Sequence, residues 1–290
     1  MPLLENGAAT MTIREALARG TSLLLRRDDL AEWAVRDAHL LLQHVLGSSR
    51  EYVMAWPERT LTSAQAAGFD HAISERLRAV PVQYLRGTQE FYGREFIVTP
   101  DVLIPRPETE LLIDEVKRYI EPEMPVMIAD VGTGSGAIAV TLAAELAMAR
   151  VTAFDISAPA LAVAGRNTAR HGVSDRMRLI QSDLLARAEG RVFDCIVSNP
   201  PYIATADRES LHPQVRDHEP ALALFGGFDG FDLYRRLIPE AWKHLRPGGL
   251  LMMEIGKPGR AIDWHLMSFS DVYTVNDLQG LPRLVVARKP

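Results

Sequence analysis

The amino-acid sequence predicts an α/β protein in which a small helical domain precedes a larger domain built on a mostly parallel sheet. Two observations support this prediction. From residue 12 to about residue 86, apolar side chains recur at helical spacing, whereas short apolar runs alternate with helix-period segments later in the chain. A chain of 290 residues, 47% of them hydrophobic, is long enough to form two domains with separate cores.

The first domain is predicted to span residues 12–86 and to consist of helices. Thr12 is followed three positions later by Glu15, and Thr62 is followed three positions later by Gln65. This spacing is typical of a capping box, in which the two side chains satisfy each other's backbone N–H groups at the start of a helix. Acidic and basic residues are balanced here, so we expect no basic stripe that would bind a polyanion.

A β-hairpin over residues 87–104 is predicted to link the two domains. Gly93 separates two short runs of strand-forming residues, Thr88–Tyr92 and Arg94–Val98. Two such runs joined by a glycine-containing turn are typical of a hairpin. Beyond this point the helical pattern of the first domain gives way to alternating strands and helices.

The larger domain, residues 105–290, is predicted to hold a Rossmann-like sheet with an antiparallel C-terminal edge. Brief apolar runs separated by helical segments are typical of parallel strands covered on both faces. These runs are Val126–Val131, Val151–Phe154, Met177–Ile180, Val192–Ser198 and Leu250–Ile255. Two final runs, Val272–Val275 and Leu284–Ala287, lie too close together for a helical crossover, so we expect them to pair antiparallel.

Charge and composition indicate the cellular location of the protein and the kinds of partner it binds. The net charge of -5 and the pI of about 5.9 lack the basic footprint of a protein that grips a phosphate backbone. Residues 1–5 carry no basic stretch followed by a long apolar run, and the most apolar helical stretch, residues 137–149, is too short for a bilayer. The single cysteine, Cys195, lies inside a predicted strand and is expected to be a buried core residue. We therefore expect a cytoplasmic protein with no membrane partner and no direct nucleic-acid substrate.

A glycine-rich loop follows the first predicted strand of the sheet and opens a helix. It reads Gly132-Thr133-Gly134-Ser135-Gly136. Its backbone N–H groups and the helix N-terminus face whatever group is bound there. Asp155, at the end of the second strand, is placed to hold a ribose diol, a combination that serves NAD, FAD and S-adenosylmethionine alike. A tight strand–helix turn without a ligand is the alternative.

The end of the fourth predicted strand discriminates among these cofactors. A dehydrogenase needs a hydride-accepting arrangement, usually with a proton-transferring His or Lys, but this strand is followed by the motif at residues 199–202. We therefore expect S-adenosylmethionine. Asp183, after the third strand, is placed to accept a hydrogen bond from the adenine amino group, or is a plain surface acid. Asp130 either faces the methionine ammonium or organises the glycine turn.

The motif Asn199-Pro200-Pro201-Tyr202 indicates which atom is methylated. A nitrogen on a planar group shares its lone pair with a π system and attacks carbon poorly. The Asn199 side-chain oxygen and the Pro200 carbonyl can accept its two N–H hydrogens and localise the pair. The two prolines hold these acceptors stiffly, and Tyr202 offers a flat face for the planar group. The alternative is that the prolines merely end a strand and that Tyr202 is ordinary packing.

In these and other segments the chain resembles the HemK-type peptide chain release factor protein-(glutamine-N(5)) methyltransferases, the PrmC family. The matching segments are Leu103-Ile104-Pro105-Arg106-Pro107-Glu108-Thr109-Glu110, Asp130 to Gly136, Val197 to Ile203, and Glu219-Pro220-Ala221-Leu222-Ala223-Leu224 followed by Gly227 and Asp229-Gly230. The likeness runs from about residue 12 to the end. The motif at 199–202 is shared with DNA and RNA amine methyltransferases, whereas the segment Leu103–Glu110 is specific to a much narrower group of proteins.

The resemblance implies a function and a set of site residues. It implies methyl transfer from S-adenosylmethionine to the side-chain amide nitrogen of the glutamine in the Gly-Gly-Gln motif of a release factor, which would be the protein partner. It makes Asn199, Pro200 and Tyr202 catalytic, with Pro201 also on the substrate. The cofactor residues are then Gly132, Thr133, Gly134, Ser135, Gly136, Asp155, Asp183, Leu184 and Asn199. Leu184 stands where some relatives have Trp, which would weaken the packing of adenine.

Several alternatives stay open at this point. Arg106, Glu108 and Glu110 either suit the first turn of a helix or border the active site. A nucleic-acid amine methyltransferase acting on adenine or guanine is the nearest rival, although little chain is left after Tyr202 for base recognition. A non-catalytic cofactor-binding module on the translation machinery is another. The eight histidines form no ligand-spaced cluster, so no metal site is expected.

Overall fold

The computed structural model describes residues 11–256 and 266–290. These residues form two compact units. The helical unit comprises the chain up to Gly87 together with His212–His218, and the sheet unit comprises Thr88–Leu211 and Glu219–Pro290. Residues 1–5, on which the expectation about a secretory signal rests, lie outside the described residues. Within the described ranges, no helix is long and apolar enough to cross a membrane.

Five α-helices form the main part of the helical unit. They are α1 (Ile13–Leu24), α2 (Ala34–Leu46), α3 (Arg50–Ala55), α4 (Ser63–Leu77) and α5 (Val82–Arg86), with a 3₁₀ turn at Ala31–Trp33 before α2. Both predicted capping boxes are confirmed: Thr12 caps α1 with Glu15, and Thr62 caps α4 with Gln65. Apolar side chains from these helices, Phe69 among them, make one core.

A buried ion pair lies inside this unit. Asp37 on α2 and Arg76 on α4 are each 1% exposed, and Arg76 Nε lies 2.8 Å from Asp37 Oδ2. Arg76 also donates to the carbonyl of Val80 at 3.2 Å and to the side-chain oxygen of Gln214 at 3.1 Å. A buried guanidinium without partners carries a large desolvation cost, and these three hydrogen bonds offset it. Gln214 belongs to the short helix α9 (Pro213–Arg216), a segment that the sequence did not assign to the helical unit.

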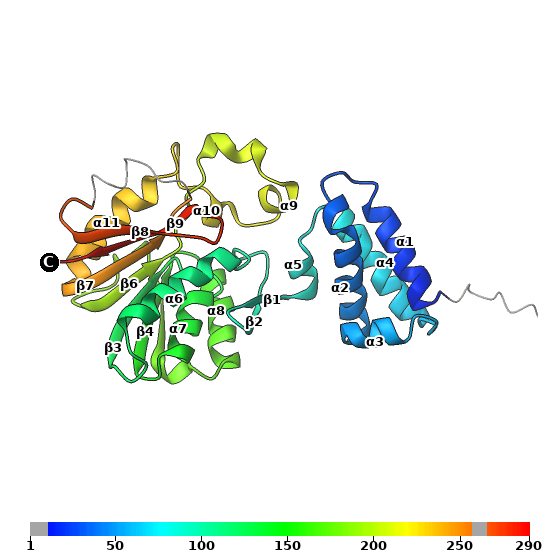
Figure 1. Ribbon diagram of the computed structural model, residues 1–290, viewed down its shortest axis with the longest axis horizontal. Helices are drawn as coiled ribbons and strands as arrows, with labels where there is room; N and C mark the ends of the chain where they lie inside the picture. Colours follow the sequence, from blue (N-terminus) through cyan, green and yellow to red (C-terminus); the bar gives the residue numbers. More distant parts are fainter. Residues whose placement is uncertain (1–10, 257–265) are drawn as a thin grey trace, which may run out of the picture. The chain divides into compact units, whose positions relative to one another are not determined.

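The sheet unit is a seven-stranded sheet with the order β5-β4-β3-β6-β7-β9-β8 (Figure 1). The strands are β3 (Val126–Val131), β4 (Ala149–Asp155), β5 (Met177–Gln181), β6 (Phe193–Ser198), β7 (Leu245–Glu254), β8 (Ser270–Asn276) and β9 (Pro282–Arg288). Strands β3 to β7 run parallel, whereas β9 is antiparallel to both β7 and β8. The predicted fold class and its antiparallel C-terminal edge are thus confirmed.

Helices cover both faces of this sheet, as Figure 1 shows. They are α6 (Glu110–Tyr119), α7 (Ala137–Glu145), α8 (Ala158–Arg170) and α11 (Asp232–His244). The unit also contains the short helix α10 (Ala221–Leu224) and 3₁₀ turns at Pro107–Thr109, Ser174–Arg176 and Thr205–Ser210. Successive residues of a strand point to opposite faces, so Ile128 packs with α6 and α7 while Ala129 packs with α11. Cys195 is fully buried in the first of these cores, and burial raises the pKa of its thiol to about 12.

The hairpin packs into the sheet unit. Its strands are β1 (Thr88–Phe91) and β2 (Arg94–Ile97), and Phe91 and Phe96 join the core beneath α7. Asn167 on α8 pairs with the backbone of Ile97: its side-chain oxygen accepts from the N–H at 2.7 Å, and its nitrogen donates to the carbonyl at 3.0 Å. The segment after the hairpin is therefore held at a defined place beside the sheet.

The ion pair of the helical unit yields a stability prediction. Replacing Asp37 by Ala leaves the Arg76 guanidinium buried without its carboxylate, and we expect this to lower the free energy of unfolding by about 3–5 kcal/mol. The matched control is Glu58→Ala, which breaks an ion pair with Arg14 whose side chains are 65% and 72% exposed. That change should cost less than about 1 kcal/mol. Urea unfolding followed by circular dichroism measures both, and equal losses would contradict the assignment.

Candidate active site

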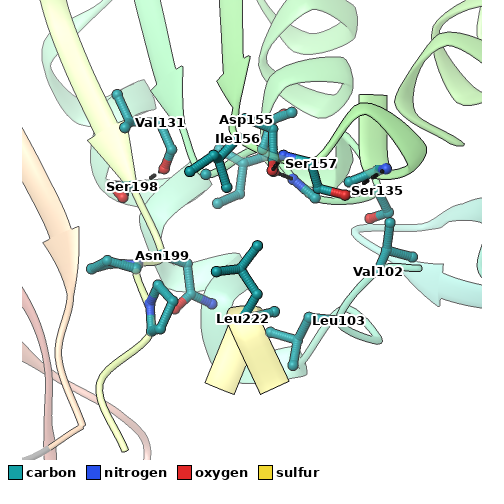
Figure 2. Close-up of a pocket in the computed structure, with 18 of the residues that line it drawn as sticks. Val102, Leu103, Val131, Ser135, Asp155, Ile156, Ser157, Ser198, Asn199 and Leu222 are labelled. Carbon is teal, nitrogen blue, oxygen red and sulfur yellow. Dashed lines mark hydrogen bonds between the residues drawn. The ribbon is translucent and has the colours of Figure 1, made fainter. Parts of the chain in front are cut away.

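A cavity of about 290 Å³ lies at the carboxyl ends of the parallel strands (Figure 2). Its lining includes the residues that follow four neighbouring strands: residues 132–135 after β3, 155–157 at the end of β4, 182–184 after β5 and 199–201 after β6. Open α/β sheets bind their ligands at this edge. The structure thus brings most of the sequence-predicted site residues to one cavity; Gly136 and Tyr202 do not line it.

The glycine loop turns sharply between β3 and α7. Gly132, Gly134 and Gly136 have φ angles of 75°, 54° and 80°, in the left-handed region that favours glycine. Gly136 caps α7, and a Cβ there would lie 3.2 Å from the Cβ of Ala164, so it has a role in the turn and in helix packing. At Gly132 and Gly134 a Cβ would meet nothing within 4 Å, so the bare backbone leaves open space for a ligand above the loop.

Asp155 ties the glycine loop to the end of β4. Its Oδ2 accepts the Gly134 N–H at 2.8 Å and its Oδ1 accepts the Ser157 N–H at 2.9 Å. Burial raises the pKa of this carboxyl, and the backbone donors counteract the rise. A carboxylate has about four lone-pair sites, so acceptor capacity remains for a hydroxyl group of a bound ligand. Figure 2 shows Asp155 and Ser157 at the cavity wall.

Asp130 has a structural position in the same turn. Its carboxyl is fully buried and does not line the cavity, and its Oδ2 accepts the hydroxyl of Thr133 at 2.6 Å. Burial raises the pKa of Asp130 to about 7, and the nearby charge of Asp155 adds to the rise. Of the two roles left open by the sequence, the geometry favours organising the glycine turn.

Asp183 and Leu184 lie at another part of the cavity lining, after β5. Asp183 Oδ2 is 2.7 Å from Nη2 of Arg236, a residue of α11 that also lines the cavity. Both side chains are about half exposed (48% and 50%), so this pair contributes little to stability. Leu184 is buried and has a φ of 47°, an uncommon conformation for a residue with a side chain. Arg236 leaves the second oxygen of Asp183 available to another donor.

Two segments far apart in the sequence form the opposite wall. Figure 2 shows Leu103 and Leu222 across the cavity from Asp155. Glu219, whose side chain is 1% exposed, holds these segments together: its Oε1 accepts from the Arg106 guanidinium and its Oε2 accepts the Ile104 N–H at 3.1 Å. Arg106 therefore both pairs with Glu219 and borders the cavity.

The two acids that follow Arg106 differ in their surroundings. Glu110 Oε1 accepts the Tyr92 N–H of the hairpin at 2.8 Å, which gives Glu110 a structural contact away from the cavity lining. Glu108 is exposed and does not line the cavity either. Of the three charged residues, Arg106 therefore borders the cavity, Glu110 has a structural contact, and Glu108 does neither.

The motif after β6 carries the acceptor candidates. Asn199, Pro200 and Pro201 line the cavity, and Asn199 Nδ2 donates to the hydroxyl of Thr109 at 3.1 Å. Tyr202 instead lines a neighbouring cavity of about 280 Å³. Direct contact between Tyr202 and the substrate stays a prediction.

Three glycines approach this motif closely. A Cβ at Gly226 would lie 2.5 Å from the carbonyl oxygen of Pro201, and a Cβ at Gly230 would lie 2.3 Å from that of Tyr202. A Cβ at Gly256 would lie 2.3 Å from Cδ2 of the Tyr202 ring. Only residues without a side chain fit at such distances, so the backbone and ring of the motif are enclosed by neighbouring backbone.

Sequence reasoning missed several residues of this site. Thr109 was overlooked although it lies between Glu108 and Glu110, and a hydroxyl that starts a helix reads as ordinary local chemistry. Glu254 accepts the Thr109 hydroxyl at 2.5 Å; an acid that ends an apolar strand beside β6 was an available signal. Arg236 gave no signal, because its partner Asp183 is 53 positions away. Among residues 11–256 and 266–290, no group of His, Cys, Asp and Glu is arranged to hold a metal ion.

Known protein families match both parts of this chain. Residues 15–87 match the PrmC N-terminal domain and residues 107–215 match the methyltransferase small domain. A release factor glutamine methyltransferase from Koribacter versatilis is 47% identical over 87% of this chain and 90% of the relative. One from Geobacter sulfurreducens is 41% identical over 90% of this chain and 93% of the relative. This chain belongs to the family of release factor glutamine methyltransferases.

Solved structures of methyltransferases share the fold of the sheet unit. The hMettl16 catalytic domain in complex with MAT2A 3'UTR hairpin 6 superposes with a TM-score of 0.55 at 17% identity, over 71% of this chain and 88% of that one. A methyltransferase from Pyrococcus furiosus superposes with a TM-score of 0.51 at 19% identity, over 69% and 90% of the two chains. At these identities the likeness concerns the fold alone.

The buried Asp130 makes stability depend on pH. Its pKa is about 7 in the folded protein and near 4 in an unfolded chain, so between these values the unfolded state releases a proton that the folded state keeps. The free energy of unfolding should then fall with rising pH, by up to about 1.4 kcal/mol per pH unit, and level off above pH 7. Asp130→Asn cannot ionise and should lose this decline. Urea unfolding from pH 5 to pH 8 measures it, and parallel curves for the two proteins would remove the assignment.

Proposed function

We propose that this protein transfers the methyl group of S-adenosylmethionine to the side-chain amide nitrogen of the glutamine in the Gly-Gly-Gln motif of a peptide chain release factor. The observation that carries the proposal is the place of Asn199: its amide lies on the wall of the same cavity as the glycine loop, with its nitrogen bound to Thr109. Its oxygen is then the atom that can accept from a substrate N–H. Membership of the release factor glutamine methyltransferase family supports the identity of the substrate.

The chain offers a place for each part of the cofactor. We assign the methionine part to the open backbone of Gly132 and Gly134, the ribose diol to Asp155, and adenine to Asp183 and Leu184. The remaining lone pairs on Asp155 suit two vicinal hydroxyls. When bound, S-adenosylmethionine supplies a methyl group on a sulfonium, a strong leaving group, so the protein needs no covalent intermediate and contributes mainly alignment.

The acceptor amide needs its lone pair localised on nitrogen. We assign its two N–H hydrogens to the side-chain oxygen of Asn199 and the carbonyl of Pro200, and we assign Pro201 and Tyr202 to shaping the surroundings of these acceptors. The close glycine contacts around Pro201 and Tyr202 favour a rigid arrangement of this kind. The proton can leave the nitrogen after methyl transfer, so no strong base is required.

The helical domain, residues 12–86, is proposed to recognise the release factor, with residues 87–104 as the connection and residues 105–290 as the catalytic domain. A pocket made of two acceptors is generic to amides, so discrimination among exposed glutamines needs a second surface. On α3 and just after it, Met54 and Trp56 are 63% and 60% exposed. Exposed tryptophan and methionine are enriched at protein interfaces, so we assign release-factor contact to this pair.

Removing the proposed acceptor should stop turnover without affecting the cofactor. Asn199→Ala loses a preorganised hydrogen-bond acceptor, which costs roughly 3 kcal/mol or about a hundredfold in kcat. Transfer of labelled methyl to a release factor measures the rate, and calorimetry with S-adenosylmethionine should give an unchanged Kd. A variant with more than about half the wild-type rate would show that Asn199 has another role.

Removing the proposed ribose acceptor should have the opposite effect. Asp155→Ala is expected to weaken binding of S-adenosylmethionine by about 1.5–3 kcal/mol, because two hydroxyls lose a charged acceptor. The variant also loses the acceptor for the Gly134 N–H, so circular dichroism is used to check that the sheet unit stays folded. An unchanged Kd in calorimetry would remove Asp155 from the cofactor site.

The recognition role of the helical unit is best tested by point substitution. Deleting residues 1–86 would also remove the partners of two residues that remain. Gln214 would lose Arg76, at 3.1 Å, and His212 would lose the Asp29 carbonyl, at 2.7 Å. We expect Met54→Ser with Trp56→Ser to raise KM for the whole release factor by about tenfold and to leave KM for a short Gly-Gly-Gln peptide unchanged. The peptide is the internal control. Equal kinetics of variant and wild type on the whole factor would place recognition elsewhere.

A further inference from the structure

Glu254 is a buried carboxylate beside the acceptor motif that the proposed chemistry does not use. It ends β7, next to β6, and it is 2% exposed. Its two oxygens serve different partners: Oε2 accepts the Thr109 hydroxyl at 2.5 Å, and Oε1 accepts the Tyr202 hydroxyl at 3.3 Å. One side chain thus connects, directly or through Thr109, to both ends of the motif that begins at Asn199.

With Glu254 ionised, the donors and acceptors in this chain of contacts can be ordered only one way. An ionised carboxylate accepts hydrogen bonds and donates none, so the single hydroxyl hydrogen of Thr109 is committed to Glu254. The Thr109 oxygen must then act as acceptor toward its other neighbour. The Asn199 amide presents its NH₂ group to that oxygen, at 3.1 Å, and this orientation leaves its carbonyl oxygen for the substrate. A flipped amide would set two acceptors against each other.

The surroundings of Glu254 bear on its charge. Burial, with a smaller effect from the charge of Glu108, raises the pKa of the carboxyl above its ordinary value, and the Thr109 and Tyr202 hydroxyls and the Arg283 guanidinium offset part of that rise. The backbone carbonyl of Glu254 also accepts the Tyr234 hydroxyl at 2.7 Å, which fixes the end of the strand. Hydroxyl donors at both oxygens together with a nearby guanidinium are what a buried carboxylate needs to stay ionised.

We propose that Glu254 is the positioning residue of the acceptor site, which sets the orientation of the Asn199 amide through Thr109 and holds Tyr202 directly. The inference rests on the proposed methyl transfer to an amide nitrogen. It adds to that function a reason why the amide of Asn199 faces the substrate with its oxygen. Without the relay, Asn199 could turn its NH₂ group to the substrate, and a donor there would repel the N–H that must be accepted.

The experiment compares kcat, KM and cofactor affinity in a set of variants of the full-length protein. Thr109→Val keeps the shape and removes the hydroxyl, and we expect it to lower kcat about 10–100-fold, with KM for a Gly-Gly-Gln peptide and the Kd for S-adenosylmethionine within about threefold. Glu254→Gln should lower kcat in the same range. Because the two residues act in series, the double variant should be no more than about threefold slower than the slower single variant. Thr109→Ser, which restores the hydroxyl, should recover most of the lost kcat.

The matched control is Glu115→Gln. Glu115 is also 2% exposed in the sheet unit and accepts a tyrosine hydroxyl, that of Tyr273, but it lies outside the cavity lining. This control should leave kcat unchanged, which separates the loss of any buried carboxylate from the loss of the relay. Cofactor binding by each variant reports that the sheet unit is folded, and Thr109→Val keeps the test decisive even where Glu254→Gln is too unstable to measure.

Each outcome decides a different claim. Normal kcat in Thr109→Val, or losses in the two single variants that multiply in the double variant, would overturn the relay while leaving the proposed function intact. Methylation of neither release factor nor peptide by the unaltered protein would overturn the proposed function itself, and the role of Glu254 with it. Reduced kcat in Glu115→Gln equal to that in Glu254→Gln would show a general effect of buried charge and would also overturn the relay.

Discussion

Five parallel strands that end at one edge are the constraint on which the rest of this molecule depends. Parallel strands deliver the chain to the same edge each time, and here each of β3 to β7 places a different polar group there. These groups are the glycine loop after β3, Asp155 at the end of β4, Asp183 after β5, Asn199 after β6 and Glu254 at the end of β7. The order of the strands therefore sets the order of these groups along the edge.

Such an edge carries more buried polar groups than a hydrophobic core tolerates without compensation. Asp130, Glu219 and Glu254 are all buried, and each has a specific donor: the Thr133 hydroxyl, the Arg106 guanidinium or the Thr109 hydroxyl. Glu219 and Glu254 each have donors at both oxygens, whereas Asp130 has a partner at Oδ2 only. Buried polar groups with such specific partners hold loops in a single arrangement. These carboxylates therefore also hold the cavity wall in place.

Local patterns predicted much of this structure, and distant pairing accounts for what they missed. β3 was predicted residue for residue because it is apolar and bounded by turns, whereas β7 begins at Leu245, five residues before the predicted start. Pro247, Gly248 and Gly249 are typical turn residues, yet they lie inside β7, at the place where its register with β6 shifts. The contacts of Glu254 with Thr109 and of Glu219 with Arg106 span 145 and 113 positions. No short window of sequence carries them, and the same holds for the place of residues 212–218 in the helical unit.

Methyl transfer to the glutamine nitrogen can be measured directly. A release factor is incubated with the protein and isotopically labelled S-adenosylmethionine, and its peptides are sequenced by mass spectrometry. We expect one labelled methyl group per molecule, on the side-chain nitrogen of the Gly-Gly-Gln glutamine. Label on another residue, or on nucleic acid added to the same reaction while the glutamine stays unmodified, would contradict it.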